Sequence, residues 1–469
     1  MTNQPFEFIK SIAFYLPQFH ETDYNNAWWG EGFTEWTACK SAKPLFENHL
    51  QPHLPSDLGF HDQTEYETLS KQVDLAKSYG VHGFCHYFYW FNGKRVLEKP
   101  TELFLENKNL DMPFCLCWAN ENWSRRWDGA DHEILIQQSY DKNNYKKFAL
   151  SLAPYFSDPR YITTDGKVLF IIYRPDEVDD LDVLLEEVRS QSIACGHKGA
   201  FILGAETFVQ HGSWVDPRDI GLDGAIEFPP HGVKVSEYRV TANTNRKFQG
   251  KVFDNFEAYM GSIARENPEY PMFRGLFPSW DNTARRKDRA NIFVGSSPKL
   301  FSYWLLALFQ WTTLIHETDK QFVFINAWNE WAEGAHLEPD VVMGRAYLEV
   351  IKKVLNNKAD LNGSVDMEAL QRLNLKQRAK HLRRHARDKR RQLSQNVMPV
   401  SNSRTESDFP FEIKKETFSM LLHDVFLARD ISAKKRAIRK ILYVQNPQLL
   451  SEHFRMSVFK GLRYFSNFG

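Results

Sequence analysis

Residues 321–334 read QFVFINAWNEWAEG. The segment 321–326 has the length and the apolar, β-favouring residues of a buried strand. Glu330 and Glu333 follow it at once, with a tryptophan before and a tryptophan after Glu330. An ordinary turn into solvent does not need two acids beside two large aromatic rings. The stretch therefore predicts a core strand whose carboxyl end opens onto a site.

Similar apolar runs recur along the chain, and each precedes a stretch compatible with a helix. Near-continuous apolar strands that alternate with helices are typical of a parallel sheet with covered faces. Eight such units predict an α/β fold, a (β/α)8 TIM-type barrel. A doubly wound open sheet is the alternative, although no Gly-rich phosphate loop follows the first strand. The strands are expected at 11–17, 81–90, 113–119, 168–174, 200–206, 223–229, 273–280 and 321–326.

Charge divides the 469 residues into two parts. The chain holds 59 Lys and Arg against 59 Asp and Glu, but residues 366–469 alone hold 22 against 10. An acidic body with a basic tail is a two-part molecule. We expect a catalytic barrel over 1–362, a basic helix and linker over 363–400, and a helical tail over 401–469.

The basic tail predicts an anionic surface as its partner. Residues 371–391 hold ten Lys and Arg and one Asp, and 431–468 mixes basic with aromatic residues. Each basic side chain near an anionic bilayer contributes roughly 1 kcal/mol. Packing of the tail on the barrel is the alternative. Nucleic acid is not expected, because the body is acidic and no nucleic-acid motif is present.

The five cysteines and the amino terminus bear on the compartment. Cys115 and Cys117 alternate along one expected strand, as buried free thiols do. The start MTNQPFEFIK has no apolar signal region. We therefore expect a cytoplasmic protein, peripheral on the inner face of the cell membrane where its tail binds lipid.

The acid pair is the first candidate for chemistry. Two carboxyl groups about one helical turn apart can face the same cavity. Crowding and burial raise the pKa of one and leave the other ionised, so an acid and a base coexist at neutral pH. Glycosyl chemistry uses such a pair. The alternative is a solvated helix start, where acids are favoured by the dipole.

Polar and aromatic residues collect after the expected strands, which is where barrels place their sites. Aromatic faces with hydrogen-bonding groups suit sugars, and buried ion pairs or core packing are the alternatives, notably for His86 and Tyr87. The candidate substrate-binding residues are Tyr15, Gln18, His20, Trp29, Glu31, Glu35, His86, Tyr87, Trp118, Asn120, Glu121, Asn122, Trp123, Arg126, Glu206, Glu227, Trp280, Asp281, Arg285, Asn329 and Trp331.

Two further patterns concern phosphate and metal. The basic loop 285–289 follows the expected seventh strand, where barrels often hold phosphate, although a solvated loop fits as well. Asp180-Leu181-Asp182 formally matches a metal-binding acidic triplet, but it opens an expected helix, where a capping role is favoured. We expect no metal and no cofactor.

Five long motifs carry a family resemblance. AFYLPQFHE, WWGEGFTEW, FCHYFYWF, WANENWSRRWDG and NAWNEWAEG occur in this order. Together they resemble the WbsX-type glycosyltransferases, bacterial polysaccharide-biosynthesis proteins whose catalytic domain is similar to the endo-α-mannosidases of glycoside hydrolase family 99. The resemblance covers roughly residues 9–355. It implies a (β/α)8 barrel and chemistry on glycans with retention of configuration.

The resemblance also implies roles for the acid pair. In the hydrolase family the first Glu of the motif is the base on the sugar's own 2-hydroxyl, and the second is the general acid/base. Carried over, Glu330 takes the first role and Glu333 the second. We predict a glycosyltransferase of lipopolysaccharide O-antigen type that uses an activated sugar donor and a glycan or lipid-linked glycan acceptor. The alternatives are an endo-acting glycoside hydrolase and a non-catalytic glycan-binding barrel.

Overall fold

The computed structural model describes residues 6–356, except 126–129, 208–214, 234, 239–244, 246, 264 and 266. These described residues all belong to one compact unit, Met1–Gly363. The predicted basic helix and linker, the helical tail and the two lipid-binding segments lie outside the described residues. Those domain boundaries stay predictions.

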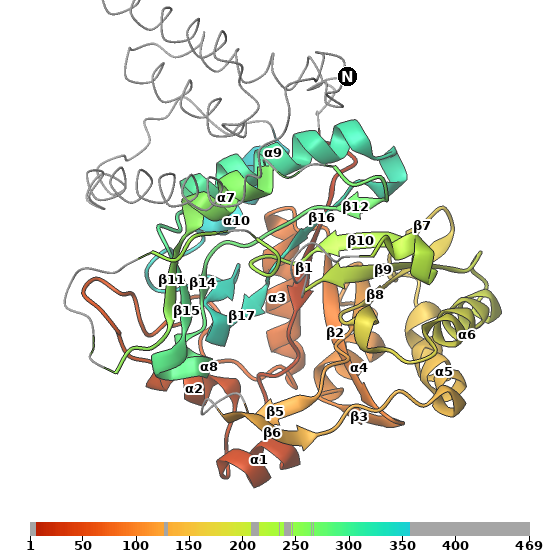
Figure 1. The fold of residues 1–469 in the computed structure, drawn as a ribbon, viewed down its shortest axis with the longest axis horizontal. Coiled ribbons are helices and arrows are strands. Elements are labelled where there is room, and N and C mark those ends of the chain that lie inside the picture. Colours follow the sequence, from red (N-terminus) through yellow and green to blue (C-terminus); the bar gives the residue numbers. More distant parts are fainter. Residues whose placement is uncertain are drawn as a thin grey trace, which may run out of the picture. The chain divides into compact units, whose positions relative to one another are not determined.

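One central sheet of parallel strands organises the described chain (Figure 1). Its strand order is β12-β10-β9-β8-β4-β2-β1-β16-β13, and every neighbouring pair along this order is parallel. The predicted (β/α)8 barrel is confirmed. The strands are β1 (Lys10–Tyr15), β2 (Gly83–Phe91), β4 (Phe114–Trp118), β8 (Lys167–Ile172), β9 (Ala200–Glu206), β10 (Gly224–Glu227), β12 (Met272–Phe273), β13 (Gly275–Leu276) and β16 (Phe322–Ile325).

The barrel closes through a strand that is split in two at Arg274. β12 pairs with β10 and β13 pairs with β16, so the two halves of one segment join opposite edges of the sheet. Glu227 lies at the split, because its Oε2 accepts from Arg274 Nε (2.7 Å) and from the backbone N–H of Gly275 (3.2 Å). A carboxylate thus supplies the acceptor that the interrupted ladder lacks at this point.

Helices cover the outer face of the barrel. The longest helix among the described residues is α9 (Pro298–Ile315). Ser297 caps its amino end, because the Ser297 hydroxyl accepts from Leu300 N, and the helix buries Trp304 and Leu308. Among the described residues, no helix combines the length and apolar character needed to cross a bilayer. The other covering helices are α3 (Tyr66–Ser78), α4 (Lys99–Glu106), α5 (Tyr145–Phe156), α6 (Leu181–Ala194), α7 (Asn255–Ile263) and α10 (Ala346–Leu355).

Side chains alternate between the barrel interior and the helix layer, as on any strand. Phe14 packs inside, with ring centroids 5.6 Å from Tyr87 and 4.7 Å from Phe228. The next residue, Tyr15, points outward and donates to Gln72 Oε1 on α3 (2.7 Å). Each strand therefore offers only every second residue to the interior.

Short elements at the rim extend the loops of the barrel. They are α1 (Asp23–Trp29), α2 (Glu35–Ser41), β3 (Lys94–Val96), β5 (Trp123–Arg125), β6 (Ala130–Ile136), β11 (Lys251–Asp254), β14 (Trp280–Asp281), α8 (Thr283–Arg286), β15 (Asn291–Val294), β17 (Asn329–Glu330) and β18 (Ala335–His336). By contrast, β7 (Thr163–Thr164) pairs with the amino end of β8. β11, β15 and β14 form a small sheet of their own. The insertions bring chain segments that are far apart in sequence to the carboxyl ends of the strands.

Candidate active site

The acid pair lies just beyond β16, as the opening stretch predicts. Glu330 ends β17, and Glu333 ends a single 3-10 turn, η7 (Trp331–Glu333). Gly334 follows with a φ of +60°, and a Cβ there would lie 3.0 Å from the backbone nitrogen of Asp281. Only glycine accepts that conformation and contact without strain. The short turn keeps both carboxyl groups within reach of one partner.

That partner is Arg285 on α8. Its Nη1 donates to Glu333 Oε1 (2.7 Å), and its Nη2 donates to Glu330 Oε2 (2.8 Å). Nη2 also donates to Glu35 Oε1 (3.1 Å), at the start of α2. We call Glu35, Arg285, Glu330 and Glu333 the arginine cluster. Three carboxyl groups, from two parts of the chain that are far apart in sequence, thus surround one guanidinium.

Burial decides the electrostatics of the arginine cluster. The side chains of Glu35 and Glu330 are 0% and 6% exposed, whereas that of Glu333 is 19% exposed. Burial raises the pKa of Glu330 well above its ordinary value, although the positive charge of Arg285 opposes the shift. The pKa of Glu35 is raised for the same reason. The loss of hydration on burial therefore raises the pKa values of Glu330 and Glu35 more than the one cation, shared by three acids, lowers them.

Two tyrosines of β2 face this cluster from inside the barrel. Burial raises the pKa values of Tyr87 and Tyr89, and the nearby charge of Glu330 raises them further. Both phenols therefore stay protonated and can donate hydrogen bonds near Glu330. Tyr87 is among the candidates that the sequence predicts but Tyr89 is not, although the spacing of two along a strand could have identified it.

The tryptophans of the motif are buried rather than open to a ligand. Trp331 is 1% exposed, its ring stacks on His336 at 3.8 Å, and its Nε1 donates to Glu338 Oε2 (2.6 Å). Trp328 is 0% exposed and packs 5.2 Å from Phe84. These rings hold the acid-bearing turn in place, and the structure shows no sugar-stacking face on them.

Glu338 is a second residue that the sequence analysis missed. Its side chain is 1% exposed, and besides Trp331 it accepts from Gln72 Nε2 (2.6 Å) and contacts His61 Nε2 (3.2 Å). Burial alone would raise the pKa of Glu338. The interaction with His61 and the hydrogen bonds that Trp331 and Gln72 donate are stronger, so the pKa lies below its ordinary value. No motif signals this role, because the partners come from α3 and from a loop after α2.

Several other predicted site residues hold loops together at the rim. Asn329 exchanges two hydrogen bonds with the backbone of Leu16 (2.8 and 2.9 Å). Asn120 likewise donates to the Arg174 carbonyl and accepts from its N–H, both at 2.8 Å. The remaining two are Asp281, bonded to His49 and Gln51 at 2.6 and 2.7 Å, and Glu121, paired with Arg174 at 3.3 Å.

Another group lies on the outer face of the barrel, away from the arginine cluster. His86 packs 5.1 Å from Phe104 of α4, and burial lowers its pKa to about 3. Trp118 packs 4.5 Å from Phe148 of α5. Tyr15 shares this outward orientation. The alternation along β1, β2 and β4 explains why these residues separate from Phe14 and Tyr87.

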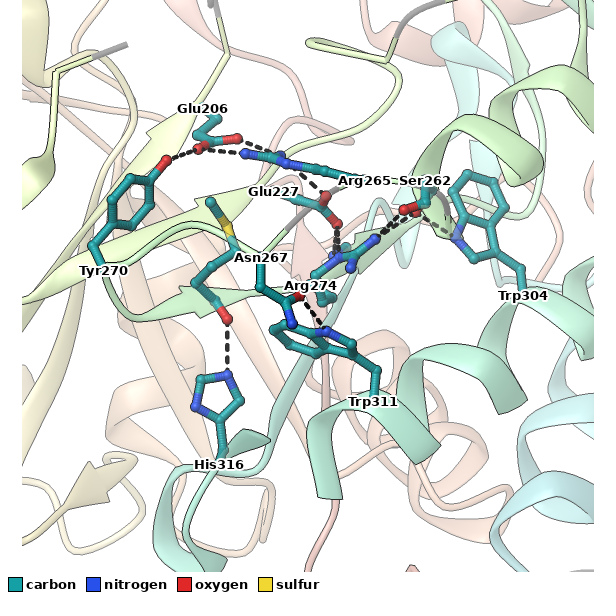
Figure 2. A network of polar contacts seen from close by, with 12 residues as sticks. Glu206, Glu227, Ser262, Arg265, Asn267, Tyr270, Arg274, Trp304, Trp311 and His316 are labelled. Atoms are coloured by element: carbon teal, nitrogen blue, oxygen red, sulfur yellow. Dashed lines mark hydrogen bonds and ion pairs between the residues drawn. The ribbon is translucent and has the colours of Figure 1, made fainter. Parts of the chain in front are cut away.

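Glu206 and Glu227 also belong to the outer face. They are in register on β9 and β10, and Figure 2 shows both beside Arg265. Phe228, the next residue after Glu227, points into the barrel, so Glu227 points out. The structure therefore assigns these two acids to an ion-pair network that closes the barrel.

The remaining candidates differ in how far their side chains are exposed. Burial lowers the pKa of His20 to about 4. Asp180, of the acidic triplet, takes the N-cap position of α6 without a side-chain capping bond. Gln18, His20 and Trp280 are buried, Trp29 and Trp123 are half-buried, Glu31 and Asn122 are exposed, and Arg126 lies outside the described residues.

Within the part of the chain that the structure describes, no group of three or more His, Cys, Asp or Glu side chains could hold a metal ion. The basic loop 285–289 does not act as one unit, because Arg285 turns to the carboxyl groups of the arginine cluster. A phosphate-binding site at this loop stays a prediction.

The fold and the arginine cluster define a (β/α)8-barrel protein with a buried acidic site at the carboxyl ends of its strands. The family model "Glycosyltransferase WbsX" matches residues 11–351. The chain belongs to this WbsX glycosyltransferase family, and hence to a family of carbohydrate-active enzymes.

The chain is also similar to two curated relatives and to two solved structures. It is 40% and 39% identical over 353 residues to the uncharacterized protein WxcX from two strains of Xanthomonas campestris pv. campestris, B100 and ATCC 33913. Each match covers 75% of this chain and 50% of the relative, so the chain spans about half the length of these relatives.

The solved structures are similar at 12% identity. An endo-alpha-mannosidase of family GH99 from Bacteroides thetaiotaomicron has a TM-score of 0.44, with 76% of this chain and 98% of that chain covered. A glycoside hydrolase-like protein has a TM-score of 0.48, with 74% and 94% covered.

Proposed function

We propose that this protein is a retaining glycosyltransferase of bacterial surface-polysaccharide synthesis, of the lipopolysaccharide O-antigen type. It transfers a sugar from an activated donor to a glycan or lipid-linked glycan acceptor. The observation that carries the proposal is the pair Glu330 and Glu333 bound to one arginine at the carboxyl ends of the strands. Membership of the WbsX family supports glycosyl transfer over other chemistry that two acids could perform.

In the first step the sugar's own 2-hydroxyl is the nucleophile. Its oxygen attacks C1 while the bond from C1 to the leaving-group oxygen breaks. The hydroxyl proton goes to the carboxylate of Glu330, and the leaving oxygen takes a proton from Glu333. The product is a 1,2-anhydro sugar with C1 inverted once.

In the second step the acceptor hydroxyl attacks C1 and opens the anhydro ring. Its proton goes to the carboxylate of Glu333, while Glu330 returns its proton to O2. Both residues then regain their starting states. Two inversions at C1 give net retention, as the family resemblance implies.

The two acids differ in burial, and the first step requires Glu330 to enter it as the carboxylate. Glu330 is the more buried, with 6% of its side chain exposed against 19% for Glu333. A carboxylate with a raised pKa is a stronger base, and Arg285 favours its ionised form. Glu333, closer to solvent, can exchange protons with a leaving group and then with an acceptor.

The test is transfer of radiolabelled sugar from nucleotide-sugar donors to a lipid-linked acceptor by the full chain. Glu330→Gln and Glu333→Gln should each lower the transfer rate by at least 100-fold, the usual scale of general acid–base catalysis. Glu317→Gln is a matched control, because its side chain is 85% exposed. Release of reducing ends from mannan-like polymers would instead favour a hydrolase. Sugar binding without turnover, unchanged in both variants, would favour a non-catalytic barrel.

A further inference from the structure

Glu35 is a buried acid that the proposed mechanism does not use. Its side chain is 0% exposed, it lies 250 residues before Arg285, and it begins the seven-residue helix α2. Two carboxyl groups are enough for the two steps above. A third one in the same buried cluster costs free energy unless it is paired or protonated.

The geometry of Arg285 ties this third acid to the reacting pair. One nitrogen, Nη2, donates to both Glu35 and Glu330, whereas Nη1 donates to Glu333. Glu35 and Glu330 therefore lie next to each other, and their negative charges repel. If all three acids were ionised, one guanidinium would face three charges, which burial disfavours.

The scaffold holds Arg285 firmly in this position. Thr283, two residues earlier, donates its N–H to Asp281 Oδ1 (3.0 Å), and Asp281 is itself bonded to His49. The backbone N–H of Arg285 donates to the Asn282 carbonyl (3.1 Å). The three elements α2, α8 and η7, which carry Glu35, Arg285 and Glu333, contact one another.

We propose that Arg285 and Glu35 act as positioning residues, forming a clamp that holds the carboxyl groups of Glu330 and Glu333 in place and sets how many protons the cluster carries. The inference rests on the proposed function in one respect, that Glu330 and Glu333 are the reacting pair. Among the described residues, the titratable or charged groups near Glu330 and Glu35 include Arg285, Glu333, Tyr87, Tyr89 and Cys39.

The first readout needs no activity: thermal melting of the full chain between about pH 4 and pH 8. An acid whose folded pKa is raised contributes stability at low pH that is lost as the pH rises through the folded pKa. Glutamine resembles the protonated acid. Glu35→Gln should therefore melt several degrees above wild type near pH 8, and this gap should close toward pH 4.

Removal of the cation should have the opposite effect. Arg285→Gln leaves three acids without their cation, so it should melt below wild type near pH 8, and this gap should narrow toward pH 4. Arg285→Lys keeps the charge and should show a flatter pH dependence. The control Glu317→Gln should show no pH-dependent gap, because Glu317 is 85% exposed.

The second readout is the acidic limb of the pH–rate profile for transfer. The midpoint of this limb is the pH at which half of the Glu330 carboxyl groups are ionised. Glu35→Gln removes a negative neighbour of Glu330, so this midpoint should move to lower pH. Arg285→Gln removes the positive neighbour, so it should move to higher pH. A purely structural role would lower the rate without moving the midpoints in opposite directions.

Differences in melting temperature between variant and wild type that do not change with pH would overturn the clamp even if transfer occurs. Absence of transfer with the predicted melting behaviour would overturn the proposed function and leave the clamp standing.

Discussion

The closure of the barrel depends on a buried ion pair that mutation can isolate. Arg274 interrupts the split strand, and its Nε lies 2.7 Å from Glu227 Oε2, with side chains 3% and 9% exposed. Figure 2 shows the second anchor of Arg274, its hydrogen bonds to Ser262. Removal of one partner from a buried pair costs about 3–5 kcal/mol, because the other charge is left uncompensated.

We expect Glu227→Gln to lower the free energy of unfolding by about 4 kcal/mol, near the middle of that range. Arg274→Met should cost about 3 kcal/mol, at the lower end, because Arg265 still pairs with Glu227 at 3.0 Å. The double variant should cost about as much as the worse single variant. The pair would then show a coupling energy of about 3 kcal/mol, because the double variant loses about 4 kcal/mol whereas the single losses sum to about 7 kcal/mol.

The assay is urea denaturation of the full chain, followed in parallel by tryptophan fluorescence and far-UV circular dichroism. Arg218→Met serves as the control, since Arg218 and Asp216 pair at 2.6 Å with side chains 49% and 26% exposed. Solvent screens an exposed pair of this kind, so its loss should change stability little. Additive effects of Glu227→Gln and Arg274→Met, or losses no larger than that of the control, would refute the closure argument.

Three further outcomes are expected. Glu338→Ala should lower the free energy of unfolding by about 2–6 kcal/mol in urea denaturation, since buried donors of Trp331 and Gln72 each lose their acceptor; an effect below about 1 kcal/mol would contradict this. Gly250→Ala should lower the free energy of unfolding by about 1–3 kcal/mol in the same assay. Gly250 and Ala290 immediately precede the paired strands β11 and β15, and a Cβ on residue 250 would lie 2.0 Å from the Ala290 carbonyl oxygen. An unchanged free energy of unfolding would contradict this. Deletion of residues 366–469 should release the protein from anionic vesicles in sedimentation while the barrel still melts cooperatively; unchanged sedimentation would remove the membrane role.

The alternation of apolar strands with helices was enough to predict the barrel. The eight expected segments correspond to the eight strands of the closed sheet, with 273–280 containing β13 and overlapping β12. This worked because a parallel strand buried on both faces has to be apolar along its length. The position of Glu330 and Glu333 beyond the last strand followed from the same pattern.

The candidate site was predicted less completely. Polar residues after a strand give the same sequence pattern whether they face the barrel interior, the helix layer or another loop. His86 and Tyr87 are neighbours, yet only Tyr87 faces the interior. Asn120 and Asn329 carry the polarity expected of ligand contacts but bind backbone groups of adjacent loops.

By itself the sequence determined the fold class, the place of the acid pair and the family, since all three depend on local patterns. Only the tertiary structure decided that Glu35 and Arg285 meet that pair, although 250 residues separate them. It also decided that Glu206 and Glu227 turn to Arg265 on the outer face. The physical reason is that charge pairing and burial depend on distances between side chains. Folding sets these distances between segments whose own sequences do not indicate which other segment will lie beside them.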